Sequence, residues 1–323
     1  PYGELITRQN WIEQGEIVGV LEGKVVIVTG AGRGVGKYIA LEAAKEGAKV
    51  VVNDLGVGVH DLEVEDVATG PAEEVAAEIR DAGGEAVADT HSIADWDDAH
   101  RIVENAMDSF GGLHGVVNNA GILRDKIFHK MSKDDFESVV QVHLNGYFYV
   151  SRAAADVFRK EMSGTYVHMT STSGVVGNVG QANYAAAKLG IVGLSRSIAL
   201  DMERYRVRSN CIAPWAFTRM TDSIPKDNPL YQERMAKIKK LGADRVAPLA
   251  VALLSDQSEA VNGQILGARA NELYLFNQSR PARTMHTAEG WTPSSILDTA
   301  FPAMSSNLTP LETSPSYFSW EPV

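Results

Sequence analysis

A strand of β-branched residues that runs directly into a glycine-rich turn decides the fold: Lys24-Val-Val-Ile-Val-Thr-Gly-Ala-Gly-Arg-Gly-Val-Gly36. The dinucleotide pattern G-x-G-x-x-G does not fit from Gly30, because Val35 stands at its last position. The spacing that fits is Thr29-Gly-x-x-x-Gly34-x-Gly36. In either spacing the glycines let the backbone approach a pyrophosphate at the N-terminus of the next helix. Such a sequence can also be an ordinary tight turn that binds no ligand. Its place directly after the first strand favours phosphate binding.

Outward from this turn, short apolar runs alternate with helical stretches. Pro71 stands where a helix is expected to begin and Gly83 where it is expected to end. Residues 55–70 are acidic, lack periodicity and are expected to form a loop. This alternation predicts an α/β fold: a single Rossmann-type, doubly wound parallel sheet with helices on both faces. The predicted strands are 24–29, 49–53, 85–88, 115–118, 165–170 and 207–212, and the longest helical regions are 132–159 and 183–204.

The two ends of the chain lie outside this pattern. Residues 1–22 are expected to form an N-terminal extension, 23–270 a dinucleotide-binding catalytic domain with its seventh strand near 264–267, and 271–323 a C-terminal tail. Prolines disfavour a long helix in the tail, while its aromatic rings favour burial. We therefore expect the tail to run extended over a surface of its own or a partner subunit. The rings belong to Trp291, Phe301, Tyr317, Phe318 and Trp320.

The composition limits the class of protein. The 323 residues are 45% hydrophobic and 22% charged, as in folded globular chains. A net charge of −11 argues against a general nucleic-acid or anionic-membrane surface. A lone cysteine, Cys211, cannot form an internal disulfide, and no Cys/His cluster has the spacing of a metal site. The sequence has no apolar stretch of bilayer length and no recognisable export leader. It therefore predicts a cytoplasmic protein without a metal, membrane or nucleic-acid partner.

Asp54 ends the second predicted strand, 18 residues after Gly36. A carboxylate there accepts hydrogen bonds from the ribose hydroxyls of NAD and repels the additional phosphate of NADP. Arg33, in the glycine turn, argues the other way, because a basic residue can bind that phosphate. Since the like-charge repulsion at Asp54 is direct, the sequence predicts NAD as the cofactor.

Tyr184 and Lys188 are four residues apart and share one face of a predicted helix. A phenol, with a pKa of about 10, is a poor base at neutral pH. A neighbouring ammonium and a positive nicotinamide ring favour the phenolate and lower that pKa. Ser171 lies 13 residues before Tyr184, just past an apolar strand end. Its hydroxyl there can hold a carbonyl oxygen, or can be an ordinary turn hydroxyl.

Together these features resemble the short-chain dehydrogenase/reductase family, from about Lys24 to Leu266. The matching pieces are the glycine turn, Asn118-Asn-Ala-Gly121, Ser171 and Tyr184-x-x-x-Lys188. The resemblance implies hydride transfer between nicotinamide and a secondary alcohol or ketone, by a homodimer or homotetramer. It implies that Tyr184 is the general base or acid, that Lys188 holds the nicotinamide ribose, and that Ser171 orients the substrate oxygen.

The resemblance also implies a set of cofactor contacts at the carboxyl ends of the strands. Asn119 is expected beside the cofactor, and Ser92-Ile93 near the adenine. The implied cofactor-binding residues are Gly30, Arg33, Gly34, Val35, Gly36, Asp54, Ser92, Ile93, Asn119, Tyr184, Lys188 and Thr218.

Two departures from the common family pattern narrow the resemblance. Asn-Leu-x-Gly reads His143-Leu-Asn-Gly146 here, and the usual Pro-Gly reads Pro214-Trp215. His143 either replaces asparagine in a water-mediated proton relay from Lys188, as a fourth catalytic residue, or is a helix histidine satisfied by a nearby carbonyl. With Asn-Asp-Leu-Gly56, these features are similar to the (3R)-hydroxyacyl-CoA dehydrogenase unit of multifunctional enzyme type 2, also known as a 17β-hydroxysteroid dehydrogenase type.

The substrate is the least constrained prediction. Residues 219–245 contain seven basic and four acidic residues, and such a basic segment suits the phosphates of coenzyme A or is simply a solvated helix face. We expect an NAD-dependent 3-hydroxyacyl-CoA dehydrogenase acting on a fatty, steroid- or aromatic-derived acyl chain. A hydroxysteroid dehydrogenase acting on a free alcohol and a non-catalytic NAD-binding regulatory protein are the alternatives.

Overall fold

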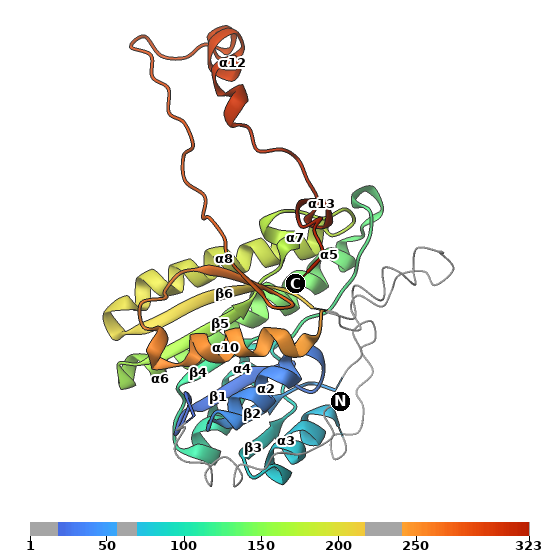
Figure 1. Cartoon of the computed structure of the whole chain (residues 1–323), viewed down its shortest axis with the longest axis vertical. Coiled ribbons are helices and arrows are strands. Elements are labelled where there is room, and N and C mark those ends of the chain that lie inside the picture. The colour runs from blue at the N-terminus through green and yellow to red at the C-terminus, as the bar shows by residue number, and fades with distance from the viewer. Residues whose placement is uncertain (1–18, 57–69, 217–240, 323) are drawn as a thin grey trace.

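The computed structural model describes residues 19–56, 70–216 and 241–322. Its centre is an eight-stranded sheet of order β3-β2-β1-β4-β5-β6-β7-β8, parallel except for the β7–β8 pair. Helices cover both faces (Figure 1), so the predicted single Rossmann-type sheet is confirmed. The strands are β1 Val25–Thr29, β2 Lys49–Asn53, β3 Glu85–Asp89, β4 Gly115–Asn118, β5 Gly164–Met169, β6 Val207–Trp215, β7 Ile265–Arg269 and β8 Glu272–Leu275.

The helices follow the strands in the order expected of a doubly wound sheet. No helix in the described part of the chain is long and apolar enough to cross a membrane. The helices are α2 Gly34–Lys45, α3 Pro71–Asp81, α4 Trp96–Phe110, α5 Lys133–Val140, α6 Gly146–Glu161, α7 Thr172–Val175, α8 Ala182–Met202, α10 Ala247–Leu254, α11 Pro293–Ser295, α12 Phe301–Met304 and α13 Ser314–Tyr317.

The strand β1 shows why the sheet needs helices on both sides. Val26 and Val28 pack in one core with α2, α3 and α10, whereas Val25 and Ile27 pack in a second core with α4, α6 and α8. Successive side chains of a strand point to opposite faces, so a strand buried on both faces is apolar at every position.

The order of the strands places a ligand crevice beside β1. This strand lies between β2 and β4, which is where the winding of the sheet reverses. Open parallel sheets bind ligands outside the carboxyl ends of their strands at such a reversal. The residues that end these strands, Thr29, Asn53 and Asn118, therefore lie at the edge where the glycine turn begins.

The long predicted helix over 132–159 is interrupted. A π-helical turn, Gln141–Asn145, separates α5 from α6, and His143 lies at its centre. Turns of this kind are rare and frequently lie at functional sites. The apolar spacing of the sequence does not reveal the turn, because one additional residue per turn barely alters the pattern.

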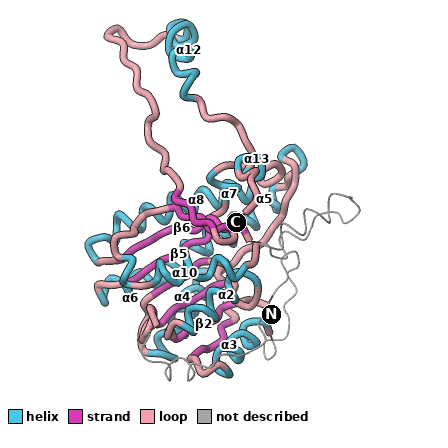
Figure 2. Tube along the Cα trace, viewed as in Figure 1, coloured by secondary structure: helices cyan, strands magenta, loops and turns pink. Residues whose placement is uncertain are grey.

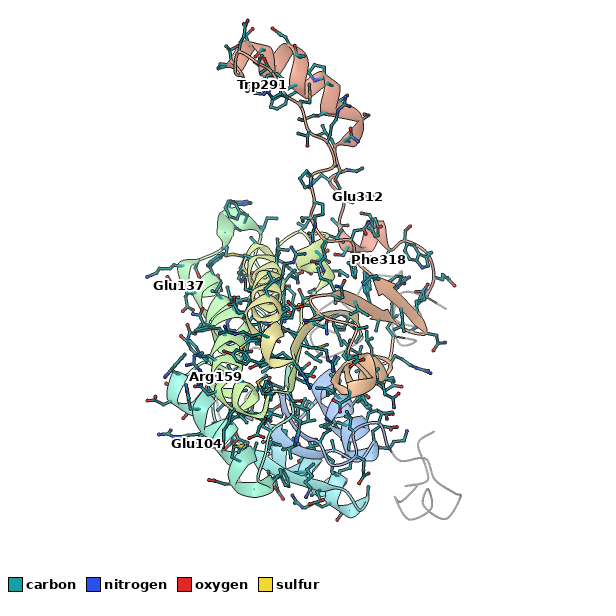
Figure 3. All side chains as sticks on the ribbon, turned by 90° about the vertical axis from the view of Figure 1, so that its left-hand side faces the viewer. Glu104, Glu137, Arg159, Trp291, Glu312 and Phe318 are labelled. Atoms are coloured by element: carbon teal, nitrogen blue, oxygen red, sulfur yellow. The ribbon has the colours of Figure 1, made fainter. Side chains whose placement is uncertain are left out.

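The tail packs on its own subunit only in part, and its expected contact with a partner subunit stays a prediction. β8 first adds an antiparallel strand beyond residue 270. The chain then leaves the body in two extended arms that carry a helical hook, Pro293–Met304 (Figures 1 and 2). The last residues return to the body, where Phe318 is only 4% exposed (Figure 3). The prolines are thus compatible with short helices as well as with extended arms.

Candidate active site

The glycine turn is packed so closely that Gly30 and Gly36 have no room for a side chain. A Cβ at Gly30 would lie 2.6 Å from the Cα of Ala120, and one at Gly36 would lie 2.2 Å from the carbonyl oxygen of Gly30. The Asn119 amide group donates to the carbonyls of Thr29 and Gly30, each at 3.0 Å. The close packing and these hydrogen bonds therefore hold the turn in place, and we call it the glycine cradle.

The helix α2 begins where the turn ends. Its N-cap residue, Arg33, is extended and gives no side-chain cap, and the first turn has no acidic residue. The first N–H groups of a helix have no intrahelical acceptor and carry positive partial charge, so this end suits a phosphate group. Gly34 and Val35 supply the first of these backbone groups.

Asp54 lies beside the turn, as the NAD prediction requires. Its Oδ2 accepts from the backbone N–H of Gly32 at 2.9 Å, and its Oδ1 accepts from that of Gly56 at 2.9 Å. Each carboxylate oxygen has a second lone pair available for a ribose hydroxyl. The residues in the cradle therefore fit an adenosine ribose and a pyrophosphate.

The adenine end of the expected site is held by a polar network. Asn53, at the end of β2, donates to Asp89 at 2.8 Å and to the carbonyl of His91 at 2.9 Å. Ser92 is half-buried, whereas Ile93 is 6% exposed and packs toward α6. The loop thus lies at the correct strand end, and the adenine contacts of Ser92 and Ile93 stay predictions.

Tyr184 and Lys188 share one face of α8, and Ser171 follows β5 on the neighbouring turn. The Lys188 ammonium, 3% exposed, donates to the carbonyl of Met169 at 2.6 Å and to the Tyr147 hydroxyl at 3.3 Å. It also lies 5.5 Å from the centroid of the Tyr184 ring. The three residues identified from the sequence therefore converge. Tyr147, on α6, is an additional member that no sequence motif indicated.

In the protein alone, the pKa of Tyr184 lies above its ordinary value. The lower pKa that the sequence predicts depends also on the nicotinamide ring, and it stays a prediction. Burial raises this pKa to about 12, although the hydrogen bond with Ser171 lowers it in part. Burial also lowers the pKa of Lys188 to about 7. Both shifts have the same main cause, because desolvation disfavours the charged form of each group.

His143 is buried directly beside Tyr184. The two rings meet edge to face, with centroids 5.2 Å apart. The Nε2 of His143 is 2.8 Å from the carbonyl oxygen of Ile122, and its Nδ1 has no hydrogen-bond partner among the described residues. Burial and the charge of Lys188 hold the pKa of His143 well below its usual value. The N–H of Ile122 also lies 3.1 Å from Nε2, so the backbone of Ile122 pairs with Nε2 whichever ring nitrogen carries the proton, and Nδ1 is the unpaired nitrogen.

Gly121 provides the space for this histidine. A Cβ at Gly121 would lie 2.1 Å from Cε1 of His143. The glycine of the Asn-Asn-Ala-Gly motif and the histidine of the π-helical turn are thus one packing unit. The structure supports both readings of His143, since a backbone carbonyl satisfies one ring nitrogen and the other remains unpaired near Tyr184. Its catalytic role stays a prediction.

Several predicted features lie wholly or mostly outside the described residues. These are residues 1–18 of the N-terminal extension, residues 57–69 of the acidic loop, Thr218, and most of the basic segment 219–245, of which residues 241–245 are described. Among the described residues, no cluster of three His, Cys, Asp or Glu side chains could hold a metal ion.

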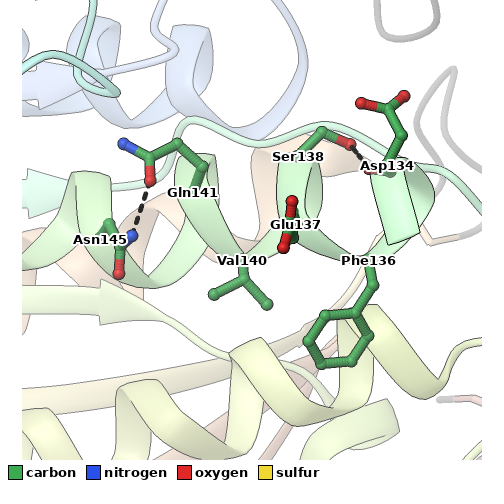
Figure 4. A pocket seen from close by; sticks show the side chains of 7 residues that line it. All are labelled: Asp134, Phe136, Glu137, Ser138, Val140, Gln141 and Asn145. Atoms are coloured by element: carbon green, nitrogen blue, oxygen red, sulfur yellow. Dashed lines mark hydrogen bonds between the residues drawn. The ribbon is translucent and has the colours of Figure 1, made fainter.

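A surface hollow of about 410 Å³ follows the exposed side of α5 and the π-helical turn (Figure 4). It contains none of the catalytic candidates. Its lining residues are Asp134, Phe136, Glu137, Ser138, Val140, Gln141 and Asn145.

Comparison with known proteins agrees with this geometry. A family model described as short chain dehydrogenase matches residues 24–229. The chain belongs to the short-chain dehydrogenase family. Members of this family are oxidoreductases that use nicotinamide cofactors.

Three relatives illustrate the range of the family. The hydroxyacyl-CoA dehydrogenase ChsB1 of Mycobacterium tuberculosis is 37% identical over 86% of this chain and 88% of its own length. The mouse peroxisomal multifunctional enzyme type 2 is 42% identical over 75% of this chain, which spans only 31% of that longer protein. A solved 7α-hydroxysteroid dehydrogenase, complexed with NADH and 7-oxo glycochenodeoxycholic acid, is 29% identical with a TM-score of 0.69, over 80% of this chain and 97% of its own.

Proposed function

We propose that this short-chain dehydrogenase is an NAD-dependent 3-hydroxyacyl-CoA dehydrogenase that acts on a fatty, steroid- or aromatic-derived acyl chain. The convergence of Ser171, Tyr184 and Lys188 at the carboxyl edge of the sheet, next to the glycine cradle, carries the proposal. The name of the mycobacterial relative, which aligns over most of both chains, supports the acyl-CoA substrate.

The described residues fit NAD at the cradle. The N-terminus of α2 takes the pyrophosphate, Asp54 takes the ribose hydroxyls, and Asn119 holds the turn in place. When bound, NAD supplies the hydride acceptor at the carbon C4 of its nicotinamide. The carboxylate of Asp54 supports NAD over NADP, because a 2′-phosphate would meet a like charge.

The catalytic residues divide the proton chemistry among them. Ser171 donates a hydrogen bond to the substrate oxygen, and the Tyr184 oxygen takes the proton of the alcohol in the direction of oxidation. Lys188 stands beside the phenol ring, where its ammonium stabilises the phenolate. The unused Nδ1 of His143 suits the water-mediated relay that carries this proton away.

Two alternatives share the cofactor site. The likeness to a solved hydroxysteroid dehydrogenase favours a free alcohol as substrate. A non-catalytic NAD-binding regulatory protein requires only the cradle, and the intact set of Ser171, Tyr184 and Lys188 counts against it, because a binding module needs no phenol base.

An oxidation assay separates the three functions. The protein is given NAD with 3-hydroxyacyl-CoA thioesters of fatty, steroid and aromatic acyl chains, or with free hydroxysteroids, and the near-ultraviolet absorbance of NADH is followed. We expect turnover of at least one thioester to exceed that of every free alcohol. Faster turnover of a free hydroxysteroid would replace the proposal with the first alternative. NAD binding without any turnover would replace it with the second.

We also propose that the protein assembles as a homodimer or homotetramer in which the helical hook of the tail reaches a partner subunit. The hook projects from its own subunit (Figure 1), and its apolar side chains are exposed, with Leu297 62% and Phe301 59% accessible. Such rings and aliphatic groups gain free energy when a second surface covers them.

A further inference from the structure

The end of the tail is joined to the loop that follows Ser171. Ser314 is 1% exposed, and both its backbone N–H and its hydroxyl donate to the carbonyl of Gly177, at 2.8 and 3.0 Å. Figure 1 shows α13 beside α7, which belongs to this loop. A carbonyl oxygen has two lone pairs, so the two donors of Ser314 use its full capacity. The contact joins residues 137 positions apart in the chain.

Hydrogen bonds within the loop hold both ends of the segment from Ser171 to Gly177. Ser171 is the N-cap of α7, and its hydroxyl oxygen accepts from the N–H of Ser173 at 3.1 Å. The N–H groups of Val176 and Gly177 both donate to the carbonyl of Thr172, at 2.8 and 3.1 Å. Because this turn is short and internally bonded, a displacement of Gly177 also displaces the backbone of Ser171.

A second contact anchors the tail on the strands β6 and β8. Phe318, 4% exposed, packs against Trp215 at the end of β6 and against Tyr274 on β8, with centroids 5.4 and 5.3 Å apart. Arg269, 4% exposed, donates to the carbonyl of Trp320 at 2.5 Å. A buried ring and a buried guanidinium paired with a backbone carbonyl make this attachment firm.

We propose that Thr313–Trp320 is a strap that positions the catalytic serine. Phe318 fixes the strap to the sheet, and Ser314 holds Gly177, so that the Ser171 hydroxyl faces the substrate oxygen. Ser314 is then a positioning residue, which acts through the loop and touches neither substrate nor cofactor. The proposal rests on the proposed dehydrogenase function in the role it gives Ser171.

A proline substitution tests the strap with little disturbance of α13. Ser314→Pro removes both donors, because proline has neither an N–H nor a hydroxyl group. The backbone of α13 is compatible with proline, since Ser314 is the first residue of the helix and Thr313 before it is already extended, with φ −91° and ψ 157°. The proline ring would stand in place of the N–H that faces the carbonyl of Gly177, so it also forces the strap and the loop apart. Ser314→Ala removes the hydroxyl alone, and Ser305→Ala in the exposed hook is the matched control.

Two measurements on the full chain are needed. Hydrogen exchange should accelerate roughly tenfold at the amides of Val176 and Gly177 in Ser314→Pro, while β1 and β4 exchange as in the parent. With the best alcohol from the oxidation assay, kcat should fall roughly tenfold, because the displaced Ser171 no longer holds the substrate oxygen well. The KM for NAD should change less than about twofold, because the cofactor cradle is untouched. Ser314→Ala should lie between parent and Ser314→Pro, and Ser305→Ala should match the parent.

Unchanged exchange in Ser314→Pro would overturn the strap. Faster exchange with an unchanged kcat would overturn the positioning role of Ser314. A loss of activity in both Ser314 variants, with faster exchange throughout the sheet, would also overturn that role. If the parent oxidises no alcohol, the proposed function fails by itself. The exchange measurement then still decides whether Ser314 holds the loop, because it needs no substrate.

Discussion

Replacing Lys188 with methionine should stabilise the protein without NAD and at the same time abolish its turnover. Burial lowers the pKa of Lys188 from 10.5 to about 7. At about 1.4 kcal/mol per pKa unit, keeping this ammonium buried costs about 5 kcal/mol of folding free energy. Methionine loses the hydrogen bonds to Met169 and Tyr147, which together contribute about 2 kcal/mol. The net gain for Lys188→Met near neutral pH is therefore about 3 kcal/mol.

The sign of this effect depends on pH. The folded pKa of Lys188 lies below the unfolded one, so the unfolded chain holds the additional proton between about pH 7 and pH 10.5. The penalty is complete below about pH 7 and disappears as the pH rises toward 10.5. Lys188→Met and the parent should consequently be about equally stable near pH 9, and the parent should be the more stable protein above that.

Urea unfolding followed by tryptophan fluorescence measures the difference, without NAD and at one fixed protein concentration, because assembly adds to stability. Lys160→Met, at an exposed position in the last turn of α6, should stay within about 0.5 kcal/mol of the parent at every pH. A Lys188→Met protein that is less stable than the parent near neutral pH would refute the reasoning. A difference that does not vary with pH would do so as well.

Three further changes test other residues. Asp54→Ala should erode a preference for NAD over NADP, because it removes the repulsion of the 2′-phosphate while Arg33 remains; comparing kcat/KM for both cofactors checks this, and a parent that prefers NADP would reverse it. His143→Ala should slow oxidation more at low pH than at high pH, with His143→Asn milder, and an unchanged pH–rate profile would leave the histidine structural. Truncation after Leu275 should weaken both assembly, measured by light scattering, and substrate affinity; an unchanged assembly and KM would contradict the proposed role of the tail.

The glycine turn and the pair Tyr184 and Lys188 could be predicted because each depends on local spacing. A turn that follows a strand, and two side chains four residues apart on a helix, keep their geometry in almost any surroundings. Asp54 was predictable for the same reason, since it directly follows the strand next to the turn.

Other features depend on packing between distant segments. The raised pKa of Tyr184 follows from the burial of its hydroxyl group by the folded chain. The hydrogen bond from Ser314 to Gly177 joins residues 137 positions apart. The hydrogen bond between Lys188 and Tyr147 joins α8 to α6, across 41 positions of the chain. Sequence spacing carries no signal for such contacts, since their geometry exists only after the sheet and its helices have assembled.

The most direct test of the proposed activity is the oxidation of a 3-hydroxyacyl-CoA with NAD by the parent and by Tyr184→Phe, followed through the absorbance of NADH. The change removes one oxygen atom, and general acid–base catalysis by such a group contributes about 100-fold or more. We expect the parent to turn over and Tyr184→Phe to lose activity by at least that factor, while NAD binding, measured by quenching of protein fluorescence, stays largely intact. Turnover by Tyr184→Phe within about tenfold of the parent would contradict the assignment of Tyr184 as the base.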